Sequence, residues 1–151
     1  MQKLILGLLV AAVAAASAYM FASSPLRAEE IMLHKNPQCG CCEEYANYLR
    51  QNGFTVTVKP THDLAAMSRE AGMTDDFQGC HLAQIDNYVV SGHVPISTIN
   101  RLLTERPAIK GITLPGMPEG SPGMSGTKNQ SFVIYEVGGT SGDKPKIYAL
   151  D

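Results

Sequence analysis

The stretch "IMLHKNPQCGCCEEYANYLRQNG" (residues 31–53) decides the fold, because a strand-like run passes directly into a helical one. Ile31–His34 predicts a short strand. The apolar residues that follow recur at i, i+3, i+4 and i+7, which is the spacing of one helix face: Cys42, Tyr45, Ala46 and Leu49. Asn52-Gly53 is typical of a helix end. Three of the chain's four cysteines are therefore predicted to lie where a strand turns into a helix.

The residues beyond this stretch predict further alternation of strands and helices. Phe54–Val58 alternates with period two, and Asp63 can cap a second helix that ends before Gly72. "HLAQI" and "YVVSG" flank Asp86-Asn87, a two-residue hairpin turn, and Pro95 opens a third helix bounded by Pro107. The predicted order β-α-β-α-β-β-α is that of a thioredoxin-like α/β fold. Within the helices, the inward residues are predicted to be Leu64, Met67, Ala71, Ile96, Ile99 and Leu103.

The C-terminal part predicts a long loop and a closing hairpin. Residues 111–130, "GITLPGMPEGSPGMSGTKNQ", are rich in Gly, Pro, Ser and Met and show no helical or strand period. Residues 131–137 and 146–150 predict a β-hairpin extension that encloses this loop. With no internal repeat, residues 29–151 are predicted to form one domain.

Residues 1–28 are predicted to be an export signal or an N-terminal anchor. Lys3 precedes an apolar run from Leu4 to about Ala22, and cleavage after Ala18 or Ala28 fits the small residues there. The apolar run is also nearly long enough to remain as a membrane anchor. Either outcome predicts that the domain works in a bacterial periplasm, with membrane contact only if the leader is uncleaved.

Composition and motifs exclude several function classes. A net charge of −2 and a pI near 6.1, without a block of Lys or Arg, give no footprint for nucleic acid or anionic lipid. No acid/base pair, Ser-His-Asp arrangement or phosphate-binding glycine loop supports a hydrolase or a transferase.

The cysteine spacing favours a soft metal over simple thiol exchange. Cys39 and Cys42 form a C-x-x-C at a helix N-terminus, which stabilises thiolates, so these two are the candidate catalytic residues of a redox reaction. Cys41 is not needed for such exchange and invites scrambling beside an exchanging pair. Cu(I) prefers thiolate and thioether ligands, and bridging thiolates can hold more than one copper. Two ordinary structural disulfides remain the alternative.

Further soft donors are predicted in other parts of the chain. Cys80 precedes the third strand, where thioredoxin-like folds carry a cis-proline that faces the C-x-x-C, so its thiol is expected to point at the cluster. Met117 and Met124 in the loop are candidate thioether ligands, and His81 and His93 are candidate ligands or their supports. The alternatives are a buried free thiol, loop methionines that only pack, and surface histidines. Met67 and Met73 are predicted to pack, and His34 and His62 show no partner pattern.

Three segments together resemble the CopG-type copper-resistance family: "NPQCGCCEEYANYLRQNGF", "GCHLAQIDNYVVSGHVPISTINRLLTERP" and "GITLPGMPEGSPGM". The resemblance implies a periplasmic thioredoxin-like protein that binds a copper cluster through Cys39, Cys41, Cys42 and Cys80. It also places His81, His93, Met117 and Met124 at motif positions of unassigned role. Tyr45 stands where the family is expected to have tryptophan, and "GCHL" replaces "SCHT".

We therefore hypothesise a thiolate copper cluster that interconverts Cu(I) and Cu(II) in copper resistance, with an electron donor or other periplasmic copper proteins as partners. Such a protein would be a copper-dependent oxidoreductase. Two alternatives stay open: a metal-independent thiol-disulfide oxidoreductase that uses Cys39 and Cys42, and a copper chaperone or sequestering protein without redox activity. A structural zinc module fits less well, since zinc usually draws two separated ligand pairs.

Overall fold

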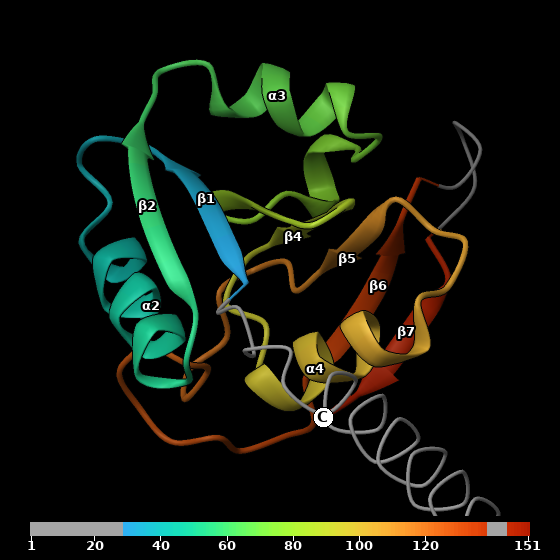
Figure 1. Ribbon diagram of the computed structural model, residues 1–151. Helices are drawn as coiled ribbons and strands as arrows, with labels where there is room; N and C mark the ends of the chain where they lie inside the picture. The colour runs from blue at the N-terminus through green and yellow to red at the C-terminus, as the bar shows by residue number, and fades with distance from the viewer. Residues whose placement is uncertain (1–28, 139–144) are drawn as a thin grey trace, which may run out of the picture.

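The computed structural model describes residues 29–138 and 145–151, so the predicted leader lies outside the described residues. Figure 1 shows the elements in chain order: β1 (Glu30–Lys35), α2 (Gly40–Gln51), β2 (Thr55–Pro60), α3 (Leu64–Glu70), the 3-10 turn η1 (Asp75–Phe77), β3 (His81–Ile85), β4 (Tyr88–Ser91), α4 (Ile96–Glu105), β5 (Gly111–Thr113), β6 (Val133–Val137) and β7 (Ile147–Leu150). No helix within the described ranges is long and apolar enough to cross a membrane.

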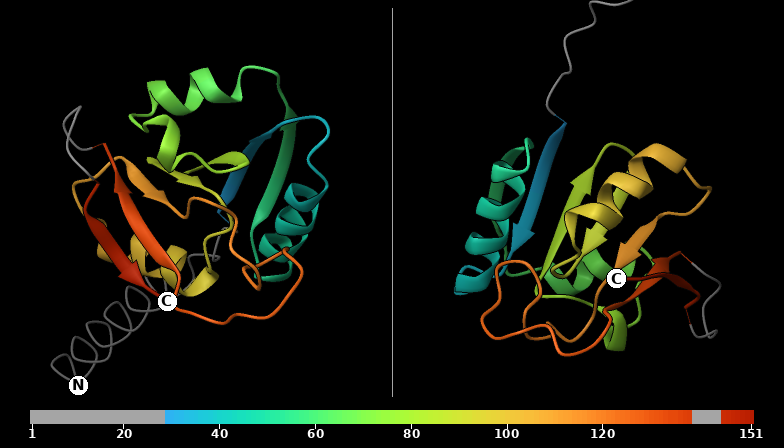
Figure 2. Two further views of the ribbon diagram at one scale, coloured as in Figure 1. Left: turned by 180° about the vertical axis from the view of Figure 1, so that it is seen from behind. Right: turned by 90° about the horizontal axis from the view of Figure 1, so that it is seen from below.

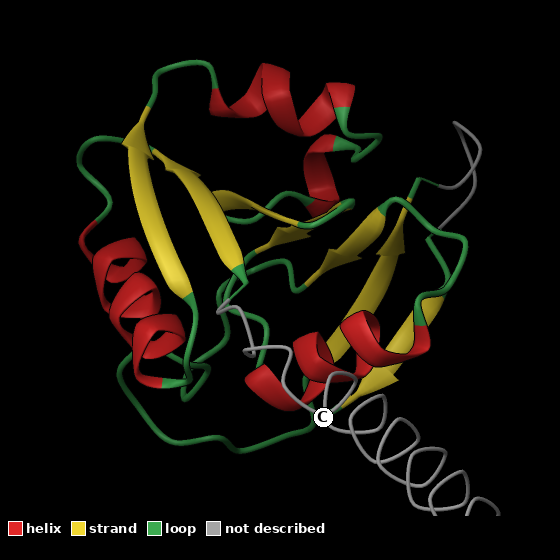
Figure 3. Cartoon of the chain, viewed as in Figure 1, coloured by secondary structure: helices red, strands yellow, loops and turns green. Residues whose placement is uncertain are grey.

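All seven strands of the described residues join one mixed sheet, in the order β2-β1-β3-β4-β5-β6-β7. β1 pairs with β2 in parallel and with β3 antiparallel, and β3 and β4 form the predicted hairpin, with Asp86 at a φ of 51° in its turn. Up to α4, the elements follow the predicted β-α-β-α-β-β-α order (Figure 3). The mixed α/β fold is confirmed, and its first four strands are compatible with a thioredoxin-like arrangement.

The C-terminal extension contains the predicted hairpin and one strand that was not predicted. β6 and β7 pair antiparallel, but residues 111–113 form β5, parallel to β4, so the prediction of a loop from residue 111 was wrong at its start. Three residues are too few to show a period of two. Gly111 permits this pairing, since a Cβ there would lie 1.9 Å from the Val89 carbonyl oxygen.

Two hydrophobic clusters fill the two faces of the sheet. The larger cluster joins α2 and α4 to one face, and the smaller one packs α3 on the other, around Met73, Leu82 and Val137 (Figure 2). Met67 and Met73 pack there, as predicted. In α4 the deepest side chains are Ile99 and Leu102, whereas the predicted Leu103 is only partly buried.

The start of α3 departs from the prediction in one detail. Asp63 is the residue directly before the helix, but its side chain makes no capping hydrogen bond. Its backbone N–H instead donates to the Thr61 hydroxyl at 3.1 Å. The turn is therefore held by Thr61, and Asp63 marks the helix start without capping it.

Candidate metal centre

The cysteine segment begins with a tight turn from Asn36 to Cys39. The Cys39 N–H donates to the Asn36 carbonyl at 3.0 Å, and the Asn36 side-chain oxygen accepts the Gln38 N–H at 3.0 Å. Asn followed by Pro favours such a turn, because Pro37 fixes φ and the Asn side chain pairs with the backbone two residues on. The turn places Cys39 directly before α2, so the cysteines lie at the predicted junction of strand and helix.

The four cysteine sulfurs form one compact group. All four Sγ atoms lie within 4.8 Å of one another. Cys39 and Cys42 are joined by a disulfide, while Cys41 and Cys80 are free thiols. The Sγ atoms of Cys39 and Cys41 are 3.4 Å apart, and those of Cys42 and Cys80 are also 3.4 Å apart. Cys80 therefore faces the C-x-x-C as predicted, and the two-disulfide alternative is not what the structure contains.

Cys80 reaches this position because it lies at the open end of the β3–β4 hairpin. The Gly92 N–H approaches the His81 carbonyl at 3.4 Å across that end. The strand ends pack closely: a Cβ on Gly79 would lie 2.3 Å from the Gly92 nitrogen. Two glycines at this crossing let the backbones approach, and the approach brings Cys80 beside His93.

His93 links Cys80 to the long loop. Its Nε2 lies 3.1 Å from the Cys80 sulfur, and its Nδ1 lies 2.6 Å from the Pro122 carbonyl oxygen. A carbonyl oxygen only accepts, so Nδ1 carries the proton and donates, which leaves the Nε2 lone pair toward Cys80. This tautomer presents Nε2 either to the Cys80 S–H or to a metal ion.

His81 is the second imidazole of the centre, and it is fully buried. Its ring stacks on Tyr45 with centroids 4.6 Å apart, and the His93 ring lies 5.2 Å away. Its Nδ1 is 3.6 Å from the Cys80 sulfur, whereas its buried Nε2 has no hydrogen-bond partner of good geometry among the described residues. One potential ligand atom from each of four residues lies within 4.8 Å of the others: a sulfur of Cys42 and of Cys80 and a ring nitrogen of His81 and of His93. Both histidines therefore belong to a second donor group.

Burial favours the neutral forms of Cys80, His81 and His93 in this second group. Burial, together with the neighbouring Cys41, raises the pKa of Cys80 to about 12. Burial and the nearby His93 lower the pKa of His81 to about 3, and burial also lowers the pKa of His93. Near neutral pH the imidazoles are therefore uncharged, which is the state that binds metals.

The donor set fits a soft metal ion after reduction. Metal–thiolate bonds of about 2.3 Å place two sulfurs on one ion at most about 4.6 Å apart, close to the spread of this group. Thiolate and imidazole are donors that suit copper. Reduction of the Cys39–Cys42 disulfide by two electrons frees the remaining two thiolates. The residues present therefore fit copper, and Cys39, Cys41, Cys42 and Cys80 are the candidate sulfur ligands.

The two predicted methionines lie on the loop between β5 and β6. Met117 is 39% exposed and has a φ of 45°, and Met124 is partly buried. The loop reaches the centre through its backbone: Pro122 contacts His93, and the Gly123 Cα packs on α2, where a Cβ would lie 2.7 Å from the Tyr45 nitrogen. Figure 2 shows the loop crossing toward α2 and returning to β6. Met124 follows this contact directly, whereas Met117 lies several residues before it.

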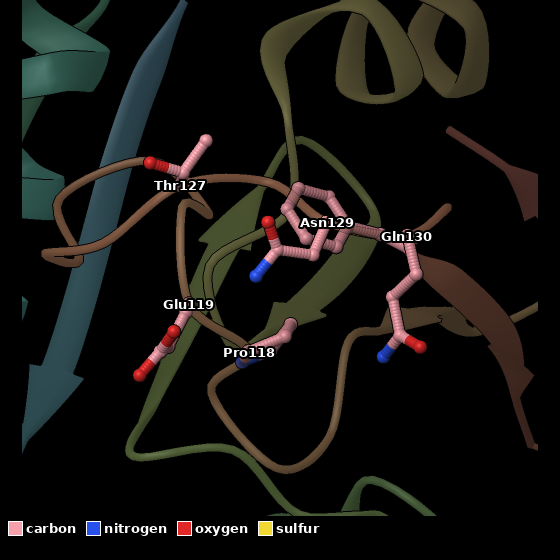
Figure 4. Close-up of a pocket in the computed structure, with 6 residues that line it drawn as sticks. Pro118, Glu119, Thr127, Asn129 and Gln130 are labelled. Atoms are coloured by element: carbon pink, nitrogen blue, oxygen red, sulfur yellow. The ribbon is translucent and has the colours of Figure 1, made fainter.

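The same loop carries a pocket that is separate from the centre. Figure 4 shows its lining, which contains neither cysteine nor histidine: Pro118, Glu119, Thr127, Asn129, Gln130 and Phe132. The pocket therefore lacks the donors of the metal centre. For the other two histidines no role was predicted. His34 is half-buried on β1 and His62 is exposed, and neither belongs to the two donor groups.

Three residues of the centre were not predicted to have a role there. Tyr45, predicted only as a core residue, stacks on His81 and lies at a tilt to the His93 ring, with centroids 5.0 Å apart. Its hydroxyl donates to the Val94 carbonyl at 2.8 Å. Pro122 acts through its carbonyl, which no sequence pattern signals. Lys35 donates from its Nζ to the Cys39 carbonyl at 3.0 Å. The sequence did carry a signal for it, because Lys35 continues the buried alternation of Ile31 and Leu33 with a charged residue.

The fold and the donor groups define a mixed α/β protein with a candidate soft-metal centre at one end of its sheet. Two solved structures are similar to it. "Copper resistance protein copG- Form 2" is 32% identical, with a TM-score of 0.72 over 83% of this chain and 99% of that chain. "Copper resistance protein copG- Form 1" is 33% identical, with a TM-score of 0.70 over 81% and 96%.

The family model described as "Protein of unknown function, DUF411" matches residues 77–124, and no curated protein matches the chain. The identity and the coverage show that the chain belongs to the CopG copper-resistance family, as the sequence motifs indicated.

Proposed function

We propose that this protein binds copper in the bacterial periplasm through Cys39, Cys41, Cys42 and Cys80, and that the bound copper alternates between Cu(I) and Cu(II) in copper resistance. The observation that carries the proposal is the convergence of four sulfurs within 4.8 Å of one another. The similar copper-resistance structures support copper as the metal. The apolar run in residues 1–28 supports export.

Reduction and copper loading are coupled in this proposal. The disulfide occupies Cys39 and Cys42, so only Cys41 and Cys80 are available as thiols until two electrons arrive. Four thiolates can then bridge more than one copper. His81 and His93 supply imidazole nitrogens beside Cys80, and the loop that carries Met117 and Met124 shields the centre and offers thioethers.

The donor set also suits a copper that changes oxidation state. Thiolates favour Cu(I), whereas imidazole binds both oxidation states. A centre built from both donors therefore holds copper through the change, with an electron donor or another periplasmic copper protein as its partner. A chaperone would instead hold Cu(I) unchanged.

One observation favours a second candidate, a thiol-disulfide oxidoreductase. The Cys39–Cys42 disulfide sits at the start of a helix, and the free Cys80 sulfur lies 3.4 Å from Cys42. Such an enzyme needs neither Cys41 nor the loop methionines. It would reduce model disulfides without copper.

An anaerobic copper titration of the reduced protein separates these functions. Bound copper is counted, and electron paramagnetic resonance follows Cu(II) through cycles of oxidation and reduction, for the wild type and for Cys41→Ser. The proposal expects several coppers per chain and a reversible signal that fails in Cys41→Ser. One Cu(I) or none, with copper-independent disulfide reduction that survives the Cys41 change, would leave the oxidoreductase. Copper bound only as Cu(I), without cycling, would leave the chaperone.

A further inference from the structure

Lys35 is a buried cation directly beneath the cysteine turn. It is the last residue of β1, and it continues the inward alternation of Ile31 and Leu33. The residue is only 3% exposed. A lysine is almost never buried unless its charge is paired, so this position calls for an explanation in terms of its partners.

Among the described residues, the polar partners of the Lys35 ammonium belong to the cysteine turn and to the first turn of α2. Its Nζ donates to the Cys39 carbonyl at 3.0 Å and to the carbonyls of Asn36 and Pro37 at 3.4 Å each. It also pairs with a Glu43 carboxylate oxygen at 3.2 Å, and that carboxylate is half exposed. One side chain thus ties the end of β1 to the turn that presents the cysteines.

The contact with the Cys39 carbonyl fixes the backbone at the first cysteine. A trans peptide is planar, so a carbonyl aimed at Nζ points the following Gly40 N–H the opposite way. The orientation of Cys39 relative to α2 is therefore set by Lys35 from within the core. Ordinary core packing would not require a charged group for this purpose.

The charge of Lys35 lies next to the same centre, one hydrogen bond from the Cys39 backbone. Cu(I) bound to thiolates carries one positive charge less than Cu(II) on the same ligands, so a nearby buried cation stabilises the Cu(I) form more. Glu43 opposes this effect, because its carboxylate pairs with the ammonium. Lys35 and Glu43 are therefore expected to shift the midpoint potential of the bound copper in opposite directions.

We propose that Lys35 is a positioning residue and the buried counter-ion of the cysteine centre: it holds the Asn36–Cys39 turn and favours bound Cu(I) over Cu(II). The inference rests on the proposed copper function and adds to it the residue that biases the oxidation state.

The test compares Lys35→Met, Lys35→Arg and Glu43→Gln with the wild type, using the reduced full-length protein and Cu(I) as the probe. Affinity is measured by competition with a chromophoric Cu(I) chelator, and the midpoint potential by a redox titration. Lys35→Met is expected to weaken Cu(I) binding about 10–100-fold and to lower the potential. Glu43→Gln is expected to raise the potential, and Lys35→Arg to stay close to the wild type. Lys59→Met, at an exposed lysine of β2, is the matched control.

The opposite signs separate a charge effect from a structural one. If Lys35→Met and Glu43→Gln shift the potential in the same direction, the pair only maintains the fold and the proposal is overturned. Unchanged affinity and potential in Lys35→Met would overturn it as well. If Lys35→Met does not fold, as judged by the thermal melt of the metal-free protein, the Glu43→Gln shift decides alone. A wild type that binds no copper would overturn the proposed function itself.

Discussion

The cysteine end of the sheet and the methionine loop offer the same class of soft donor, but the fold prepares them differently. Cys39, Cys42 and Cys80 sit at the ends of regular elements, and their sulfurs already meet. Met117 lies on a loop with 39% of its surface exposed, and this loop touches the centre through the backbone of Pro122 and Gly123. Regular elements therefore bring the sulfurs together, whereas the loop contacts the centre only through backbone atoms of Pro122 and Gly123 among the contacts described above.

Loss of one cysteine should have the largest effect. Cys80→Ser removes the only sulfur of the four that comes from outside the C-x-C-C segment, so we expect the bound copper count of the reduced protein to fall to one or none. Metal analysis after anaerobic loading measures this. Met32→Leu, which removes an exposed sulfur on β1, should load like the wild type. Full loading of Cys80→Ser would contradict this prediction, because the centre would then not need the sulfur from the β3 end.

Displacement of the loop should come next. At Gly123, a Cβ would lie 2.7 Å from the Tyr45 nitrogen and φ is +79°, so Gly123→Ala should destabilise the protein by about 2–4 kcal/mol. Gly116→Ala is the matched control, since Gly116 has a φ of +78° but open space around it, and should cost about 1 kcal/mol. Denaturant unfolding measures both. An equal loss of unfolding free energy in Gly123→Ala and Gly116→Ala would show that the loop does not pack on α2.

A smaller effect concerns pH and the buried histidines. The pKa of His81 is about 3 in the folded protein and near 6.5 when unfolded, so the unfolded chain binds more protons between these values. Stability is therefore fully present above pH 6.5 and is lost as the pH falls toward 3. The slope reaches about 1.4 kcal/mol per pH unit for this histidine.

Urea unfolding of the metal-free protein, with its disulfide intact, measures this slope from pH 7 to 4. His81→Gln should flatten the slope, whereas His62→Gln should leave it unchanged because His62 is exposed. A slope that persists in His81→Gln would assign the acid sensitivity to other groups, such as His93.

Loss of a loop thioether should have the smallest effect on copper. Met117→Leu keeps size and apolar character but removes the sulfur, so we expect Cu(I) affinity to fall about 10-fold at most. Competition with a chromophoric chelator measures the change. A loss as large as that of Cys80→Ser would instead show that the loop contributes as much to copper binding as the cysteines do.

Much of the fold followed from local pattern. The helix after the cysteines, the Asp86-Asn87 hairpin and the closing hairpin were all predicted, because each has a period or a turn signal of its own. β5 was missed because three residues show no period, and its pairing depends on Gly111 meeting β4.

The centre could be predicted in part. The spacing of Cys39, Cys41 and Cys42 predicted a soft-metal site, and the expected topology predicted that Cys80 would face these cysteines. Pro122 could not be found, since it contributes a backbone carbonyl that any residue has. Lys35 could have been found, because a lysine at an inward position of a strand departs from the alternation around it.

The proposed function requires the four cysteines to share copper at one end of the sheet. X-ray absorption at the copper edge of the reduced, copper-loaded protein tests it most directly. We expect mainly sulfur neighbours near the usual metal–thiolate distance of about 2.3 Å and a second copper within the cluster, and we expect the second copper to be lost in Cys80→Ser. A spectrum dominated by nitrogen or oxygen neighbours, unchanged in Cys80→Ser, would contradict it.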